Sequence, residues 1–234
     1  MVKYYEVINL REEIFDYEKS IYAMMIKFID NLSFLDDNKK SICLKLALAY
    51  KNNLDELYKA YDYLNSEELE FIDSKKLVKI NKTNDILIVD FKNSTFEIST
   101  ENIKKVIAGI IDILEDVLPM GTIIELKPQF IKSMYKSQSL KEVPKFIITK
   151  RFLSKKDSLS YFPYAAVQYP IGETSKGKNI HFTSKAIDKV IYKGFSDETE
   201  LAYICVMKSE MIFKKEMHSI SFSTLEEREE YISN

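Results

Sequence analysis

The sequence of 234 residues contains no tryptophan and only two histidines and two cysteines. Cys43 and Cys205 lie far apart, and neither belongs to a CxxC pair or has metal-ligand spacing. This scarcity argues against a disulfide framework and against a structural zinc site. Each cysteine is expected to be a small buried hydrophobic residue.

Long hydrophobic runs are also missing. The most apolar stretch, residues 107–114, is far shorter than the roughly 20 residues that span a bilayer. Residues 1–20 carry charges every few positions and have no apolar core of signal-peptide length. We therefore expect a cytoplasmic protein with no membrane span.

Motifs that bind cofactors or metals do not occur. The sequence contains neither GxxxxGK[ST] nor GxGxxG, so no loop that cradles a nucleotide phosphate is expected. HExxH and the EF-hand loop are missing as well. We assign no catalytic, cofactor-binding or metal-binding residues, and we expect the protein not to be an enzyme.

Proline and glycine divide the chain into two parts. No proline precedes Pro119 and no glycine precedes Gly109. Residues 1–115 carry 16 basic and 21 acidic side chains, whereas residues 116–234 carry 18 and 15. Because glycine and proline mark turns, we predict an α+β fold with two regions. Residues 1–115 form a helix-rich region with a small antiparallel β-meander, and residues 116–234 form a β-rich antiparallel module with C-terminal helices.

The expected elements of the N-terminal region follow from hydrophobic period and caps. Residues 41–64 place leucines and tyrosines three or four apart, which predicts one long amphipathic helix. Alternating residues predict a three-stranded meander. The other expected elements are a helix over about 11–32, a short helix after Ser66, strands at 76–80, 85–91 and 95–99, and a helix capped by Thr100.

The second region is expected to contain mainly strands. The strands are predicted at residues 121–126, 145–152, 164–169 and 188–195, followed by a helix within residues 197–217. Ser223 is followed three residues later by Glu226, a capping-box pattern that predicts a terminal helix. Pro119 is expected to stop the preceding helix, Gly121 to allow close backbone approach, and Gly172 and Gly194 to adopt positive φ in turns.

Two alternatives for the second region concern chemistry and nucleic acid. Cys205 and His181 could form a nucleophile and base, but no surrounding motif supports a dyad, so a buried thiol is preferred. Residues 127–156 are rich in lysine with interleaved rings, which suits either nucleic acid, an acidic protein, or the solvated edge of a sheet. The basic and aromatic residues of this segment are Lys127, Lys132, Lys136, Lys141, Lys145, Lys150, Arg151, Lys155, Lys156, Phe130, Tyr135, Phe146 and Phe152.

A tyrosine-rich segment follows the basic segment. Rigid aromatic side chains are favoured at protein interfaces, although most tyrosines of a chain line its own core. We select a candidate partner-binding set from this segment and from the end of the preceding strand. The set is Tyr161, Phe162, Tyr164, Tyr169, Lys150 and Arg151.

Four blocks of the second region, in order, are LPMGTIIELK (118–127), KFIITKRF (145–152), YAAVQYPIGE (164–173) and HFTSKAIDKVIYKGFSDETE (181–200). Together they resemble the Firmicutes domain of unknown function 4176 over about residues 116–205. The resemblance implies an accessory protein of type VII secretion loci that encode LXG-domain toxins. It implies a cytoplasmic adaptor or chaperone that binds an LXG-type toxin or its small helical partners. The alternative is an immunity or regulatory protein that binds a toxin domain, and nucleic-acid binding is less favoured. The oligomeric state is left open.

Overall fold

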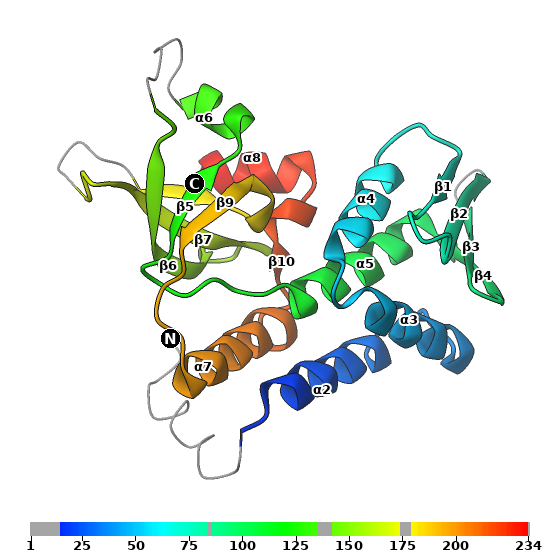
Figure 1. The fold of residues 1–234 in the computed structure, drawn as a ribbon. Helices are drawn as coiled ribbons and strands as arrows, with labels where there is room; N and C mark the ends of the chain where they lie inside the picture. The colour runs from blue at the N-terminus through cyan, green and yellow to red at the C-terminus, as the bar shows by residue number, and fades with distance from the viewer. Residues whose placement is uncertain (1–14, 84–85, 135–141, 174–178, 234) are drawn as a thin grey trace. The chain divides into compact units, whose positions relative to one another are not determined.

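The computed structural model describes residues 15–83, 86–134, 142–173 and 179–233 (Figure 1). The chain divides into two compact units: residues 16–115 form one, and residues 116–234 belong to the other. Helices and mainly antiparallel sheets make up both, so the predicted α+β class is confirmed. The two units are described in turn.

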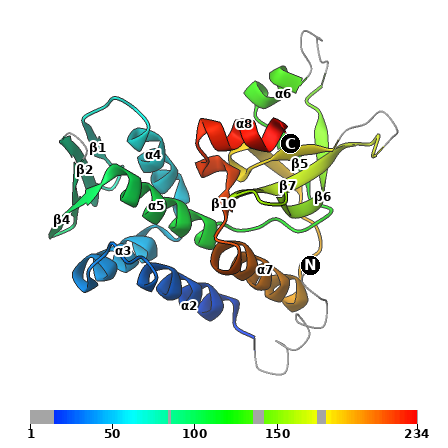
Figure 2. The same cartoon turned by 180° about the vertical axis from the view of Figure 1, so that it is seen from behind.

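Helices dominate the first unit (Figure 2). Three of them begin at a side-chain cap, because Asp16, Asp36 and Ser99 each accept a hydrogen bond from the main-chain N–H three residues later. The cap of the last helix is therefore Ser99 and not the expected Thr100. The helices are α2 (Tyr17–Asp30), α3 (Asp37–Tyr50), α4 (Leu54–Leu64) and α5 (Thr100–Leu114).

The single long helix expected over residues 41–64 is wrong, since α3 ends at Tyr50 and α4 begins at Leu54. The Asn53 amide donates to the Tyr50 carbonyl over 2.8 Å, and Asn53 has a non-helical φ of −151°. Adjacent asparagines favour such turns because their side chains compete for backbone hydrogen bonds. The buried leucine and tyrosine stripe continues across both helices, so its spacing did not reveal the break.

A meander follows α4 in place of the short helix expected after Ser66. The Ser66 hydroxyl accepts from the N–H of Glu68, which closes a turn and starts no helix. The sheet has one strand more than expected, in the order β1-β2-β3-β4. Its strands are β1 (Glu70–Ile72), β2 (Val78–Thr83), β3 (Ile86–Phe91) and β4 (Ser94–Ser99).

Helix α5 is the central core element of the first unit. Its apolar face is buried, with Ile110 and Ile111 fully inaccessible. At Gly109 a Cβ atom would lie 1.9 Å from Cζ of Phe28, so the missing side chain admits the α2 ring. Glycine within this helix therefore serves packing between helices.

The second unit is built on a six-stranded sheet with the path β10-β7-β6-β5-β9, in which β8 pairs with β7. All pairs are antiparallel except β7 with β10. The strands are β5 (Ile123–Leu126), β6 (Lys145–Ser154), β7 (Ser160–Tyr169), β8 (Ile180–Phe182), β9 (Ile187–Tyr192) and β10 (His218–Ser219). The four predicted strands are present, whereas β8 and β10 were not predicted.

Three helices accompany this sheet: α6 (Pro128–Met134), α7 (Glu198–Ser209) and α8 (Leu225–Ser233). A π-helical turn, Glu210–Lys214, continues α7. Short 3₁₀ turns lie at Ser184–Ala186 and Ile220–Phe222. The predicted capping box is displaced by one residue: Thr224 N–H donates to Glu227 Oε2 over 2.7 Å, and Glu227 N–H donates to the Thr224 hydroxyl over 3.2 Å. Helix α6 was not predicted.

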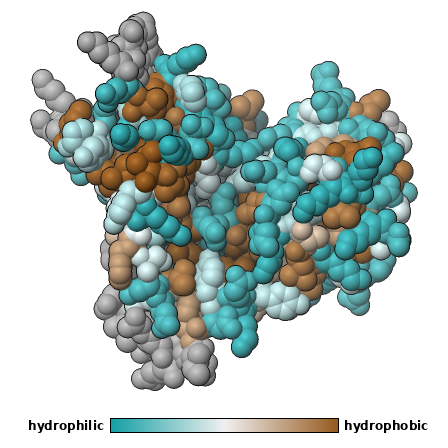
Figure 3. All heavy atoms as spheres, in the orientation of Figure 1, coloured by the Kyte–Doolittle hydropathy of each residue, from teal (hydrophilic) through white to brown (hydrophobic). Residues whose placement is uncertain are grey.

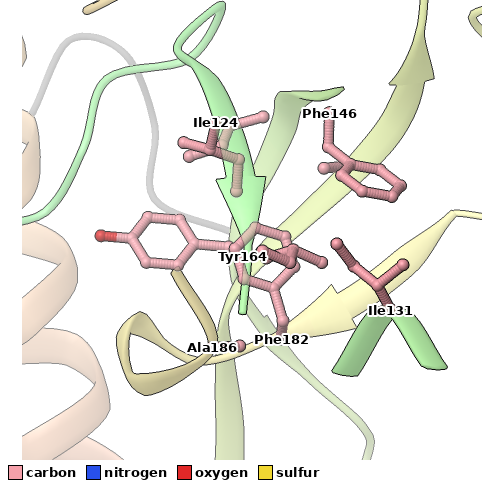
Figure 4. Close-up of a cluster of buried hydrophobic side chains, with 9 residues drawn as sticks. Ile124, Ile131, Phe146, Tyr164, Phe182 and Ala186 are labelled. Atoms are coloured by element: carbon pink, nitrogen blue, oxygen red, sulfur yellow. The ribbon is translucent and has the colours of Figure 1, made fainter. Parts of the chain in front are cut away.

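Two buried clusters hold the second unit together. One contains Ile124, Phe146, Tyr164 and Phe182, with Ile131 of α6 beside them (Figure 4). The other joins the sheet to the segment that follows it and contains Phe152, Tyr161, Met207, Met211 and Met217. The C-terminal helical segment therefore shares a core with the sheet.

Candidate functional site

Two of the predicted partner-binding tyrosines belong to the core. Tyr164 is 1% exposed and stacks on Phe182 with 5.5 Å between ring centroids, and its hydroxyl accepts the Leu118 N–H over 2.9 Å (Figure 4). Tyr161 is buried in the methionine-rich cluster. Strand β7 is covered on both faces, so these two tyrosines form no binding surface, which corrects that expectation.

The other two aromatic candidates lie in different environments. Phe162 is half-buried and contacts His181 and Tyr231, with ring centroids 5.5 and 5.1 Å apart. Tyr169 is exposed at the end of β7. The segment YFPY therefore does not present a continuous aromatic surface.

Lys150 and Arg151 are adjacent in β6 but differ completely in surroundings. Lys150 is exposed, whereas the Arg151 side chain is 3% exposed and forms a bidentate ion pair with Glu200 of α7. The Arg151 guanidinium also lies 5.3 Å from the centroid of the Tyr203 ring. Arg151 therefore joins strand to helix, and its expected role in partner binding is wrong.

In its described residues, 127–134 and 142–156, the basic segment does not form the alternating surface that nucleic acid would need. Phe146 and Phe152 are core residues, so they cannot stack on bases. Phe130 is exposed on α6. Lys136, Lys141 and Tyr135 lie outside the described residues. What remains of the described part of the segment is a set of surface lysines.

Three predicted turn residues, Pro119, Gly121 and Gly194, lie together at the start of the module, where the roles of the two glycines are reversed. Gly121 has φ +79° with nothing within 4 Å of an added Cβ, so it supplies positive φ and no close approach. At Gly194 φ is not positive, and an added Cβ would lie 2.2 Å from the Met120 carbonyl oxygen. Gly172 has the expected positive φ of 72°. The Pro119 carbonyl accepts the Thr122 hydroxyl over 2.6 Å and closes the turn.

This turn is clamped to the end of β9. Thr122 is fully buried, and its hydroxyl accepts the Gly194 N–H over 3.0 Å. Together with the contact between Gly194 and Met120, this bond fixes the chain after β9 against the entry to β5. The side chains of neighbouring residues are thereby held on the surface.

Those side chains form an exposed apolar patch that the sequence did not predict. Strand β9 is the edge of the sheet and is exposed along almost its whole length. Tyr192 is 62% exposed and Phe195 is 81% exposed. Hydrophobic side chains gather over β9 in the space-filling view (Figure 3). We define the β9 patch as Met120, Val190, Ile191, Tyr192 and Phe195.

An exposed group of large apolar side chains on an edge strand is a candidate binding surface. Its polar neighbours Asp188, Lys189 and Lys193 are exposed and give it a charged border. An apolar centre with a polar rim is typical of protein–protein interfaces. The sequence contains an apolar triplet, residues 190–192, between Lys189 and Lys193. This pattern indicates an exposed apolar surface only when β9 is known to be the edge of the sheet.

The Cys205 thiol, which was considered for catalysis, is not an activated nucleophile, and the contacts of His218 do not form a triad. Burial raises the pKa of the Cys205 thiol to about 11, so it stays protonated near neutral pH. His218 Nε2 lies 3.3 Å from Ser223 Oγ and 3.5 Å from Glu227 Oε2. Both partners face the same ring nitrogen, whereas a serine triad needs one on each. These contacts join β10 to α8.

Burial lowers the pKa of His218 despite the opposing effect of Glu227, and burial with Lys150 and Lys155 lowers that of His181. The unfolded chain therefore takes up protons first as pH falls below about 6.5. We expect the free energy of unfolding to be highest above this pH and to decrease between pH 7.5 and 5.5. Urea unfolding at both pH values should show a smaller decrease for His218→Gln; an unchanged decrease would contradict this assignment.

A small cavity in the first unit has room for about one water molecule. Two of its polar lining residues are engaged, since Glu56 accepts from Ser74 N–H over 2.9 Å and Asp73 accepts from Val78 N–H over 2.6 Å. Within the described ranges, no group of three or more His, Cys, Asp or Glu side chains could hold a metal ion. In the same residues, no helix has the length and apolarity to cross a membrane.

Residues 117–203 match the family described as "Domain of unknown function (DUF4176)", which confirms the resemblance seen in the four sequence blocks. The match contains the Pro119–Thr122 turn, the Arg151–Glu200 ion pair and the whole β9 patch. No curated protein and no solved structure matches the chain.

Proposed function

We propose, from the premise that residues 117–203 carry the DUF4176 domain, that this chain is a non-enzymatic accessory protein that binds a protein partner through the β9 patch. The observation that carries the proposal is the group of large apolar side chains on an edge strand, headed by Tyr192 and Phe195. Aromatic residues of this kind supply most of the binding energy where they anchor interfaces.

The shape of β9 favours a helical partner over an added strand. Its pairing with β5 is irregular at two places, between Ile123 and Ile124 and between Glu125 and Leu126. Irregular pairing and edge lysines both obstruct regular hydrogen bonding by a further strand. The patch therefore offers its side chains, on which the apolar face of an amphipathic helix can pack.

The resemblance of the four sequence blocks supports a choice of partner. We propose that it is an LXG-type toxin, or one of its small helical partners, held in the cytoplasm as cargo of type VII secretion. The protein would then act as an adaptor or chaperone before export. Covering apolar helix faces until export is the task that the β9 patch is suited to perform.

The test is co-purification with co-expressed LXG toxin and small helical proteins encoded beside it. The double variant Ile191→Ser/Tyr192→Ser should weaken binding by roughly 30-fold or more, because hot-spot residues contribute about 2 kcal/mol or more. Tyr22→Ser is the matched control, since Tyr22 is an exposed tyrosine of the first unit and lies outside the patch.

Three outcomes would overturn this proposal. Association of none of these proteins with the wild-type chain would remove the adaptor function. Binding that survives the double variant would displace the site from β9. Retained binding to the isolated C-terminal toxin domain would instead identify an immunity or regulatory protein.

A further inference from the structure

A second group of side chains gathers where β6, β7, β8 and α8 meet. Lys150 of β6 and His181 of β8 flank Ala165 of β7, because both are paired with it in register. Ala165 is fully buried and small, so it separates two exposed polar side chains without covering them. This row places a lysine and a histidine on the two strands that flank β7.

Lys155, in the turn after β6, completes the group. Its ammonium lies 4.7 Å from the centroid of the Tyr231 ring and donates to the Tyr231 carbonyl. Tyr231 in turn contacts Phe162 edge to face, and Phe162 contacts the His181 ring. The lysine is thus held in place by an aromatic wall, and an ammonium with three donors retains capacity for a ligand.

The positive charge of this group is not balanced by carboxylates. Among the residues that the structure describes, no Asp or Glu forms an ion pair with Lys150, Lys155 or His181. Both lysines act on His181, whose pKa they help to lower. Cationic side chains without a counter-ion favour an anionic ligand.

We propose that Lys150, Lys155 and His181 form a binding site for the carboxylates of an acidic segment of a partner protein, with Phe162 and Tyr231 as an apolar wall. In taking the ligand to be a protein, the proposal rests on the proposed function. Lys150 and His181 are both paired with Ala165, and Lys155 is connected to His181 through Tyr231 and Phe162. Nucleic acid instead needs contacts along successive phosphates. The methylene groups of a glutamate can pack on the rings while its carboxylate meets the lysines.

A bound carboxylate also reverses the electrostatic environment of His181. It favours the imidazolium, so ligand binding and proton uptake strengthen each other. Among the described residues, the groups around His181 are Lys150 from β6, Lys155 from the turn after β6, and Phe162 and Ala165 from β7. Tyr231 of α8 contacts Phe162. Affinity should therefore rise as pH falls through the titration of His181.

The test uses hexaglutamate as the probe and NMR signals of the two histidines as the readout, on the full chain at low salt. Hexaglutamate should shift the His181 signal and raise its apparent pKa, while His218 serves as an internal reference. Lys150→Gln should weaken binding about tenfold, which corresponds to about 1.4 kcal/mol, because it removes one charge contact. Lys189→Gln, a substitution of an exposed lysine on β9, should leave affinity unchanged.

An unmoved His181 signal, or unchanged affinity in Lys150→Gln, would overturn the proposal. Equal effects of inorganic phosphate or oligothymidine at the same charge concentration would show a general anion site instead of a peptide site. Ile191→Ser/Tyr192→Ser should leave hexaglutamate binding intact. Loss of partner binding in Ile191→Ser/Tyr192→Ser tests the proposed function, whereas loss of hexaglutamate binding in Lys150→Gln tests the cationic site. The two proposals can therefore fail independently.

Discussion

Arg151→Met is expected to lower the free energy of unfolding of the second unit by about 3–5 kcal/mol. The substitution removes both hydrogen bonds to Glu200 and leaves that carboxylate without its cation in a partly buried position. It also ends the contact of the guanidinium with the Tyr203 ring. Urea unfolding of the full chain, followed by a signal from the second unit, measures the loss.

The controls separate the ion pair from the loss of a long side chain. Lys150→Met changes the neighbouring exposed lysine and should alter stability by less than about 0.5 kcal/mol. Arg151→Met/Glu200→Leu removes both charges and should recover much of the loss, because an apolar pair can replace a buried ion pair. A loss below about 1 kcal/mol for Arg151→Met would show that the pair behaves like a solvent-exposed one.

Gly194→Ala is expected to destabilise the second unit by about 3 kcal/mol, the upper part of the range for overpacking. The added Cβ would lie 2.2 Å from the Met120 carbonyl oxygen and 3.1 Å from the Thr122 nitrogen. Both are main-chain atoms, so no side-chain rotation relieves the clash. The chain must move, and the bond from Gly194 N–H to the Thr122 hydroxyl is lost with it.

Gly121→Ala is the matched control, because it lies in the same joint and meets nothing within 4 Å. Its cost is limited to positive φ, about 1–2 kcal/mol. Urea unfolding gives the free energies of unfolding. Hydrogen exchange at the main-chain amide of residue 194 should be faster in the folded Gly194→Ala variant than in the wild type, but unchanged in Gly121→Ala. Equal losses in both variants would contradict a steric role for Gly194.

Local sequence signals predicted much of the secondary structure. Alternation identified β2, β3 and β4, whose inward residues Val78, Leu87 and Val89 are buried. Periodicity and capping residues gave wrong predictions where one local pattern is compatible with two structures. The leucine and tyrosine stripe passes through the break at Asn53, and Ser66 can close a turn as easily as it caps a helix.

The candidate site was harder to predict because exposure depends on strand order. Tyr161 and Tyr164 are of a residue type that is common at interfaces. Both are buried, because β7 lies inside the sheet with strands on both sides. Val190 and Tyr192 have the pattern of an ordinary strand, and only the strand order shows that β9 is the edge of the sheet. Pairing between segments far apart in sequence decides both cases, and periodicity carries no information about it.

The shared core of sheet and C-terminal helices has a consequence for dissecting the protein into fragments. Met207, Met211 and Met217 cover Phe152 and Tyr161, yet all three methionines lie beyond the family match, which ends at residue 203. A fragment cut there would also lose β10, the neighbour of β7. The family match over residues 117–203 is therefore shorter than the segment that folds as one unit. Fragments for expression should include the C-terminal helices as well as the matched residues.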